Sequence, residues 1–324
     1  MPIDWFGVSQ DPAAAASRPR LAGHGATLVT GGKGFAGGHL VELLSSREGR
    51  VTLAPPRGEL DLRDRDAVRR AVADTRPATV FHLAAFSSPS RSWEQPDGAV
   101  LANVEMTLNV LEAVRHEAPG AGVVLVGSGQ AYGEPDELPV TEDVRLEPLN
   151  PYAVSKASSD MLGRQYAAAY GMRVVRLRPF NHAGPGQSED YVVSTLARQV
   201  AAAEAAGADE ALIRTGDPDS ARDFTDVRDV VRAYALAAEL DGGAYNVCSG
   251  HPTTVRELVE AVSAHARIPV RHEVDPGRLR AHDARTMHGS HERLTEATGW
   301  QPEIPLEQTV RDTLDWWRER LARR

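Results

Sequence analysis

A glycine-rich turn between a short apolar segment and a helical stretch constrains this chain more than any other feature. The segment ATLVT runs from Ala26 to Thr30, and GGKGFAGGHL then places Gly31, Gly34 and Gly37 at intervals of three residues. Glycines in such a place can simply end a strand. Between a strand and a helix, however, they let the backbone approach a pyrophosphate, which free N–H groups of the helix bind. The turn therefore predicts a dinucleotide site.

Short apolar segments and longer helical stretches alternate after this turn. The predicted strands are Ala26–Thr30, Arg50–Leu53, Ala78–Ala85, Gly122–Ser128 and Arg173–Pro179. The predicted helices cover residues 37–46, 64–75, about 99–117 and 150–170. Strands that are apolar throughout and are separated by helices form a parallel sheet covered on both faces. We therefore expect an α/β protein with a doubly wound, Rossmann-type parallel sheet.

The alternation ends after Arg178, in the Gly- and Pro-rich loop NHAGPGQSEDY. The segment YNVCSG, from Tyr245 to Gly250, then has the pattern of a strand that returns to the sheet. We predict a flexible extension over residues 1–24, a dinucleotide-binding domain from residues 25–178 and about 225–250, and a smaller C-terminal substrate-binding domain from residues 179–224 and about 251–324.

Composition and charge narrow the possible partners. A net charge of −9 disfavours nucleic acid and acidic membrane surfaces, so an anionic ligand needs local basic residues. No apolar run approaches the ~20 residues that span a bilayer, and the first residues lack the pattern of a secretory signal. The single cysteine, Cys248, has no disulfide partner and is expected in the core, which fits a reducing cytoplasm. We predict no metal site.

The stretch PYAVSKASSD places Lys156 four residues after Tyr152. Side chains at this spacing are neighbours on one face of a helix. An ammonium beside a phenol favours the phenolate and is expected to lower a pKa that is ordinarily near ~10. A lone pair of this kind is more often a surface contact, so its meaning depends on the rest of the chain.

Two further segments fit a dinucleotide. ELDLRD offers Asp61 and Leu62 as contacts for an adenine amino group, although Asp61 equally fits an acid at a helix N-terminus. HLAA ends the third predicted strand with Leu83, Ala84 and Ala85, small or apolar residues against which a cofactor can lie. His82 itself is expected to be a packed core histidine.

Together, the three glycines, HLAA, Ser128 and the Tyr152/Lys156 pair resemble the extended short-chain dehydrogenase/reductase family of sugar-nucleotide epimerases, dehydratases and reductases. The resemblance covers nearly the whole chain from Thr27 onward, with its motifs in order. The segments RPFNHAGPGQ, RDFTDVRDVVRAY, YNVCSG and TGWQPEIPLEQT narrow it to GDP-6-deoxy-4-keto-mannose reductases and the neighbouring GDP-mannose 4,6-dehydratases.

The resemblance implies a catalytic set of Ser128, Tyr152 and Lys156. Tyr152 would give a proton to a carbonyl oxygen as hydride reaches its carbon. Lys156 would lower the Tyr152 pKa and hold the nicotinamide ribose, and Ser128 would hydrogen-bond the carbonyl oxygen. Dehydratases carry a carboxylate base where this chain has Gln130, whose neutral amide cannot accept a proton.

The resemblance also implies two sets of binding residues. The expected cofactor-binding residues are Gly31, Lys33, Gly34, Phe35, Ala36, Gly37, Arg57, Asp61, Leu62, Leu83, Ala84, Ala85, Tyr152, Lys156 and Pro179. The expected substrate-binding residues are Ser87, Ser88, Arg91, Gln130, Asn181, Arg222, Arg280 and Asp283. Asn181, Arg222 and Arg280 would contact the sugar-nucleotide phosphates, because arginine binds phosphate in a bidentate way. For each arginine alone, a solvated surface position is the ordinary alternative.

The chain departs from the family at the second strand, which lacks the usual terminal acid. That acid would hold the 2′-hydroxyl of NAD and repel a 2′-phosphate. Because Arg57 and Lys33 lie close by in sequence, we expect NADP(H), with NAD(H) as the alternative. The expected reaction is reduction of a GDP-4-keto-6-deoxy-hexose by a homodimer. The alternatives are an epimerase or dehydratase that recycles bound cofactor, and a catalytically silent dinucleotide-binding protein.

Overall fold

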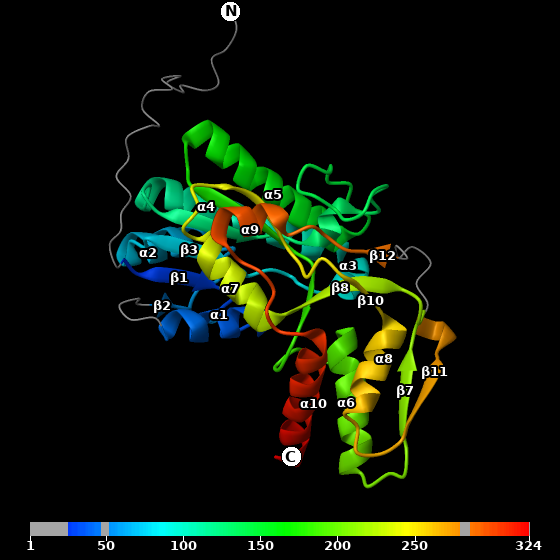
Figure 1. The fold of residues 1–324 in the computed structure, drawn as a ribbon. Coiled ribbons are helices and arrows are strands. Elements are labelled where there is room, and N and C mark those ends of the chain that lie inside the picture. Colours follow the sequence, from blue (N-terminus) through cyan, green and yellow to red (C-terminus); the bar gives the residue numbers. More distant parts are fainter. Residues whose placement is uncertain (1–24, 47–51, 279–285, 324) are drawn as a thin grey trace, which may run out of the picture.

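The computed structural model describes residues 25–46, 52–278 and 286–323. They form two parts, of which the larger lies at the top of Figure 1 and the smaller at the bottom. The predicted extension over residues 1–24 lies outside the described residues.

The larger part is built on a six-stranded sheet in which every neighbouring pair of strands is parallel. Its order is β2-β1-β3-β4-β5-β9. The strands are β1 (Thr27–Thr30), β2 (Thr52–Leu53), β3 (Thr79–His82), β4 (Gly122–Val126), β5 (Val174–Pro179) and β9 (Gly243–Val247). The chain goes outward from β1 to β2 and then crosses back to β3, so the order reverses beside β1. Ligands of doubly wound sheets bind at this point. The predicted fold class, a doubly wound parallel sheet, is confirmed.

Helices cover both faces of this sheet, because successive side chains of a strand point to opposite sides. Leu28 and Val80 pack on one face, whereas Val29 and Phe81 pack on the other. The first face is covered by α2 (Arg65–Thr75), α4 (Pro96–Glu117) and α5 (Pro151–Tyr170). The second is covered by α1 (Phe35–Ser45), α7 (Val227–Ala237) and α9 (Glu292–Thr298).

The smaller part has an apolar core of its own, which includes Leu196, Ile213, Leu258 and Leu314. Its helices are α6 (Val192–Ala205), α8 (Val255–Ala264) and α10 (Leu306–Ala322). Strands β7 (Ala211–Thr215) and β11 (Val270–Val274) pair in parallel beside them. Strand β8 (Ala221–Asp226) pairs with β6 (Asn181–Ala183), β10 (Pro252–Thr254) and β12 (Thr286–Met287), and connects the two parts.

One segment packs differently from its predicted domain. Leu294 and Trp300 belong to the range assigned to the substrate-binding domain, yet both are fully buried against the main sheet and α7. The Trp300 indole donates a hydrogen bond to the carbonyl of Asp229, 3.0 Å away. The segment around α9 therefore belongs to the larger part, and with that change the division into two domains stays a prediction.

The strands end earlier than the sequence suggests at the edge where ligands bind. Strand β3 ends at His82 and β4 at Val126, so that residues 83–85 and 127–128 are loop rather than strand. Between β3 and α5, two short elements were not predicted: helix α3 (Pro89–Glu94) and the 3₁₀ turn η2 (Gly129–Tyr132). Both lie at this same edge of the sheet, where the predicted site residues gather.

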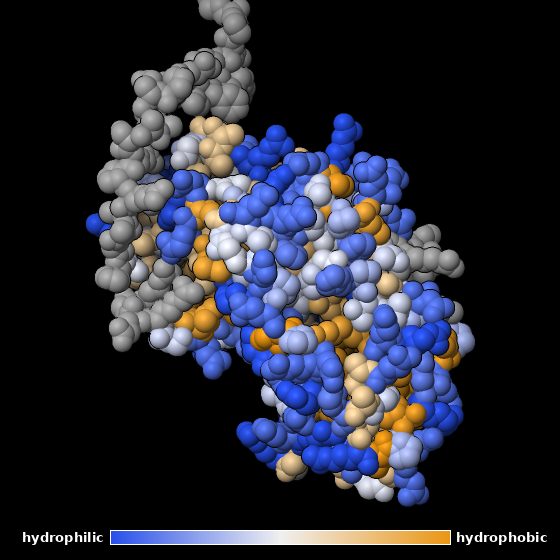
Figure 2. All heavy atoms as spheres, in the orientation of Figure 1, coloured by the Kyte–Doolittle hydropathy of each residue, from blue (hydrophilic) through white to orange (hydrophobic). Residues whose placement is uncertain are grey.

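None of the described helices is both long and apolar enough to cross a lipid bilayer. The described residues also hold no cluster of three or more His, Cys, Asp or Glu side chains that could bind a metal ion. Figure 2 shows a largely hydrophilic face, on which apolar side chains gather where the two parts of the molecule meet.

Candidate active site

The glycine turn packs tightly against the loop that follows β3. Gly31 has a φ of +75°, and a Cβ there would lie 2.7 Å from the backbone nitrogen of Ala84. A Cβ on Gly37 would lie 2.1 Å from the carbonyl oxygen of Gly31. Neither position can carry a side chain. The turn thus brings residues 31–37 beside residues 83–85, as expected for the two halves of one cofactor site.

The N-terminus of α1 is open for an anion. Gly34 is its N-cap residue and supplies no side-chain hydrogen bond, and the first turn carries no acidic residue. The free N–H groups and the positive end of the helix dipole therefore face the turn without a partner from this helix. This arrangement fits a pyrophosphate.

Ser128, Tyr152 and Lys156 come together at the ends of β4 and α5. Tyr152 is in the first turn of α5, and the Ser128 side chain is near enough to its hydroxyl to act on its pKa. The Lys156 ammonium lies 6.0 Å from the centre of the Tyr152 ring and donates a hydrogen bond to the carbonyl of Val126, 2.8 Å away. The side chain of Lys156 is buried, with 6% exposed. The three side chains predicted to act together are therefore adjacent.

The expectation that Lys156 lowers the pKa of Tyr152 is wrong. Burial raises the pKa of Tyr152 to about 12, opposed by the neighbouring Ser128 side chain. Burial also lowers the pKa of Lys156 to about 8. Desolvation disfavours the charged form of each group, and the ammonium is directed to Val126 rather than to the phenol. Tyr152 is therefore a protonated acid over the ordinary pH range.

His82 is a core residue, as expected. Its side chain is 5% exposed and bonds through Nδ1 to the Thr30 hydroxyl, 2.8 Å away, and through Nε2 to the Thr107 hydroxyl, 3.3 Å away. Burial, with a smaller effect of the Lys156 charge, lowers the pKa of His82 to about 3. The imidazole is thus neutral, and it links β1, β3 and α4.

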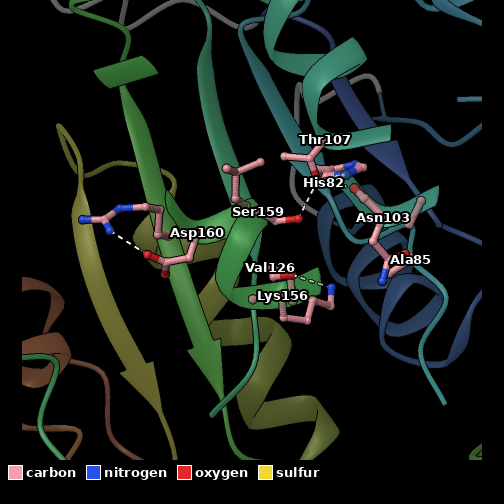
Figure 3. A pocket seen from close by; sticks show the side chains of 12 residues that line it. His82, Ala85, Asn103, Thr107, Val126, Lys156, Ser159 and Asp160 are labelled. Carbon is pink, nitrogen blue, oxygen red and sulfur yellow. Dashed lines mark hydrogen bonds and ion pairs between the residues drawn. The ribbon is translucent and has the colours of Figure 1, made fainter. Parts of the chain in front are cut away.

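A small cavity of about 10 Å³ lies behind Lys156, between β3, β4, α4 and α5 (Figure 3). Its polar lining includes His82, Asn103, Thr107, Ser159 and Asp160. This volume is close to the space that one water molecule occupies. The cavity is therefore too small for a sugar or a nucleotide. The residues that line it pack around Lys156.

A buried ionic network lies beyond this cavity. Arg178, 5% exposed, donates from Nε to Oδ2 of Asp160, 2.9 Å away, and from Nη1 to the hydroxyl of Tyr132, 2.8 Å away. Tyr132 in turn donates to Oδ1 of Asn246, 2.7 Å away. Asp160 is on α5 and Tyr132 ends η2, so the network holds the helix of Tyr152 and the turn that follows Ser128 in one arrangement.

Two supporting residues are missing from the sequence prediction. The Asn103 side chain accepts from the backbone N–H of Phe86 at 2.6 Å, donates to the Phe86 carbonyl at 3.2 Å and donates to the Ser155 hydroxyl at 2.8 Å. Ser92 Oγ accepts from the N–H of Tyr152, 3.2 Å away. The sequence does contain a signal for Asn103: it is a polar residue on the same face of α4 as Thr107, Val110 and Val114, which are buried.

The predicted cofactor-binding residues outside the turn differ in their exposure to solvent. Lys33 and Arg57 are exposed cations, so both are free to meet a charged ligand. The carboxylate of Asp61 accepts a hydrogen bond from the N–H of Arg63, 3.0 Å away. Asp64, and not Asp61, caps the helix that follows. Leu62 packs in the core, which leaves only its backbone for a ligand. Phe35 stacks on His182, with ring centres 5.8 Å apart, and Pro179, at the end of β5, is buried.

The predicted substrate residues occupy several elements around this edge. Ser88 is the N-cap of α3 and accepts from the N–H of Arg91, whose exposed guanidinium lies over the Phe86 ring. The carbonyl of Ser87 accepts from the Tyr191 hydroxyl, 3.1 Å away. Asn181 begins β6 and Arg222 lies on the neighbouring β8. Arg280 and Asp283 lie outside the described residues.

Comparison with known proteins places the chain in a family. The family model described as GDP-mannose 4,6 dehydratase matches residues 58–313. The chain is 36% identical over 297 residues to GDP-6-deoxy-D-mannose reductase from Pseudomonas aeruginosa, which covers 90% of this chain and 97% of that protein.

Solved structures agree with this match. The structure of RMD from Pseudomonas aeruginosa complexed with NADPH has a TM-score of 0.82 and 35% identity, over 91% of this chain and 99% of that one. The Thermus thermophilus UDP-glucose 4-epimerase in complex with NAD has a TM-score of 0.78 and 33% identity, over 90% and 99%. The chain therefore belongs to the GDP-mannose 4,6-dehydratase family of NAD(P)-dependent short-chain dehydrogenases/reductases that act on sugar nucleotides.

Proposed function

We propose that the protein reduces the 4-keto group of a GDP-4-keto-6-deoxy-hexose with NADPH, giving GDP-rhamnose or a related 6-deoxy sugar nucleotide. The observation that carries this proposal is the adjacency of Ser128, Tyr152 and Lys156 at the sheet edge that the glycine turn also reaches. The similarity to a GDP-6-deoxy-D-mannose reductase and to an NADPH-bound structure supports the choice of substrate and cofactor.

The cofactor supplies a hydride to carbon 4 of the sugar when it is bound. Side chains of the protein supply the proton and position the reacting groups. Tyr152 transfers its proton to the oxygen that becomes the new hydroxyl, and its pKa of about 12 keeps that proton in place until then. Ser128 hydrogen-bonds the same oxygen. Lys156 lies beside the Tyr152 ring, 6.0 Å from its centre, and would hold the nicotinamide ribose.

The open N-terminus of α1 and residues 83–85 would hold the cofactor, and Lys33 and Arg57 would meet its 2′-phosphate. Asn181 and Arg222, with Arg280, would hold the diphosphate of the sugar nucleotide. Ser87, Ser88, Arg91, Gln130 and Asp283 would surround the sugar. A panel of keto and non-keto sugar nucleotides, analysed by mass spectrometry with NADPH present, tests this assignment. Reduction of a 4-keto substrate supports it, and turnover of non-keto substrates alone would refute it.

Guanine is the base that we propose for the nucleotide, on the strength of the family similarity. Calorimetric titration with GDP, UDP and dTDP tests this choice. Tighter binding of either pyrimidine nucleotide would move the protein to another branch of the family.

Gln130 argues against dehydration within the same family. A 4,6-dehydratase must remove a proton from carbon 5, which a carboxylate can accept and an amide cannot. Purified protein with GDP-mannose and NADP⁺ should therefore yield no 4-keto-6-deoxy product. Epimerisation with recycled cofactor is the second candidate, because an epimerase with NAD shares the fold and 33% of the sequence. A catalytically silent protein is disfavoured, since such a protein has no need of all three catalytic side chains.

A homodimer is proposed through α4 and α5, which pack side by side along one edge of the molecule (Figure 1). Their outer faces carry exposed apolar side chains at matched seven-residue spacing: Leu101 and Leu108 on α4, and Val154 and Met161 on α5. Leu101 is 67% exposed and Met161 is 64% exposed. Sedimentation of Leu101→Glu/Met161→Glu tests this: a monomer is expected, and an unchanged dimer would exclude this face. The single cysteine, which has no internal disulfide partner, supports the proposal of a cytoplasmic enzyme.

A further inference from the structure

Asn150 caps the helix that carries Tyr152, and this role fixes the orientation of its amide. Its Oδ1 accepts a hydrogen bond from the backbone N–H of Ala153, 2.8 Å away. A backbone N–H can only donate, so the atom that faces it must be the oxygen. The Nδ2 group of Asn150 therefore occupies the other branch of the amide, where it can only donate.

That branch faces Gln130. Nδ2 of Asn150 lies 3.3 Å from Oε1 of Gln130. Because Nδ2 is a donor, Gln130 must present its oxygen to Asn150. Nε2 of Gln130 is then turned away from Asn150, and it donates to no acceptor among the described residues. Nε2 of Gln130 thus has no hydrogen-bond partner in that part of the chain, yet it is not one of the buried side-chain atoms that lack a partner. It is therefore open to solvent.

Gln130 is close to the catalytic set. Its backbone N–H donates to Oγ of Ser128, 3.2 Å away, and the Ser128 side chain is near enough to the Tyr152 hydroxyl to act on its pKa. Gln130 follows Ser128 by two residues, and Asn150 precedes Tyr152 by two residues. The pair Asn150–Gln130 thus bridges the two segments that supply the proton donor and its orienting hydroxyl.

We infer that Asn150 is a positioning residue that turns the Gln130 amide so that it offers the bound sugar a hydrogen-bond donor. A keto oxygen can only accept, so a donor beside carbon 4 suits a 4-keto sugar. A hydroxyl can accept or donate and would tolerate either orientation. The observed orientation therefore suits the keto substrate, whereas a reversed amide would oppose a keto oxygen and not a hydroxyl. The identity of that substrate rests on the function proposed above, whereas the orientation of the amide does not.

Asn150→Asp reverses this arrangement with little effect on the helix. Aspartate caps a helix about as well as asparagine, so one carboxylate oxygen replaces Oδ1 at the N–H of Ala153. The other oxygen can only accept, and Gln130 must turn to donate to it. Gln130 then presents Oε1 to the keto oxygen, and two acceptors face each other. Asn150→Ser is the matched control, because serine also caps the helix but is too short to hold the amide in either orientation.

The expected kinetic result is a fall in kcat/KM for the 4-keto substrate of about 10–100-fold in Asn150→Asp and at most about fivefold in Asn150→Ser. Adding Asn150→Asp to a Gln130→Met protein should have little further effect, because the amide is gone. Equal losses in the Asp and Ser variants would overturn the inference. So would a full loss in the Gln130→Met background, which would show that the new charge acts directly on Tyr152.

A second arm needs no substrate. Gln130→Glu keeps an oxygen opposite Nδ2 of Asn150, so the Tm of this variant should stay within about 2 °C of the wild-type Tm. The double variant Gln130→Glu/Asn150→Asp brings two carboxylates together. Its Tm should be several degrees lower than the sum of the two single changes predicts. Additive changes in Tm would refute the contact and the inference with it. If the wild type fails to reduce the keto substrate, the proposed function is wrong. The comparison of Tm among the single and double variants still tests the orientation of the Gln130 amide.

Discussion

Lys156 donates its hydrogen bond to the carbonyl oxygen of Val126, 2.8 Å from Nζ, and makes no contact with a carboxylate that would neutralise it among the described residues. This contact ties α5 to the end of β4, the strand that leads into Ser128. Among the described residues, the hydrogen-bond partner of this buried charge is a carbonyl dipole alone. Desolvation then dominates and lowers the pKa of the ammonium to about 8.

This pKa predicts the pH dependence of the reaction. Reduction needs the charged ammonium, so kcat/KM should be level below about pH 8 and fall as Lys156 loses its proton above it. Tyr152 adds no fall in this range, because its pKa of about 12 keeps the phenol protonated. The pH profile of kcat/KM checks this. A folded Lys156→Arg protein should be slower and show no fall near pH 8, since arginine does not titrate there; a fall that persists would assign it to another group.

Tyr152→Phe should abolish turnover and leave cofactor binding nearly intact. The ring still packs, but the positioned proton donor is lost, which typically costs ~10²–10⁴-fold in rate. Lys156→Ala should damage both turnover and cofactor binding. Steady-state rates together with a fluorescence titration of NADPH check these outcomes. A Tyr152→Phe protein that kept more than about a tenth of the wild-type rate would remove Tyr152 from the role of acid.

The exposed cations near the cofactor site predict a preference for NADPH. Strand β2 is followed by Ala54 and Pro55, with no acid to repel a 2′-phosphate. Lys33→Ala/Arg57→Ala should lower kcat/KM for NADPH by about tenfold or more and that for NADH by less than about threefold. Arg70→Ala, an exposed cation on α2, is the control and should change neither. A wild-type protein that prefers NADH would contradict the assignment.

The Asp160–Arg178 pair predicts a large effect on stability. Arg178 is 5% exposed and Asp160 is 4% exposed, so Asp160→Asn leaves a buried guanidinium without its counter-charge. Loss of one partner of a buried pair typically lowers the free energy of unfolding by about 3–5 kcal/mol. Urea unfolding measures this. Arg69→Met breaks the exposed pair with Glu117 and should cost less than about 1 kcal/mol; equal losses for the two variants would mean that Asp160 does not compensate Arg178.

Local pattern was enough to predict the fold and the centre of the site. The unbroken apolar strands and the spacing of Gly31, Gly34 and Gly37 required a covered parallel sheet with a tight turn beside β1, and the structure has both. The spacing of Tyr152 and Lys156 required a shared helical face, which α5 provides.

Features that depend on contacts distant in sequence were beyond that reasoning. Asn103 meets Ser155 across 52 residues, and Tyr132 meets Asn246 across 114. The pKa of Tyr152 follows from its burial, and the Lys156 side chain turns to Val126 instead of the phenol; a helical spacing reveals neither. Trp300 belongs to the core of the larger part because its indole reaches Asp229, 71 residues earlier.

A single-turnover reaction with NADPH deuterated at carbon 4 of the nicotinamide tests the reductase assignment most directly. The enzyme is mixed with the GDP-4-keto-6-deoxy-hexose, and both the cofactor and the sugar product are analysed. We predict one oxidised cofactor for each sugar reduced, with deuterium at carbon 4 of the product. Turnover of the sugar nucleotide with the cofactor pool unchanged and no deuterium in the product would contradict the reductase assignment and indicate an epimerase that recycles its cofactor.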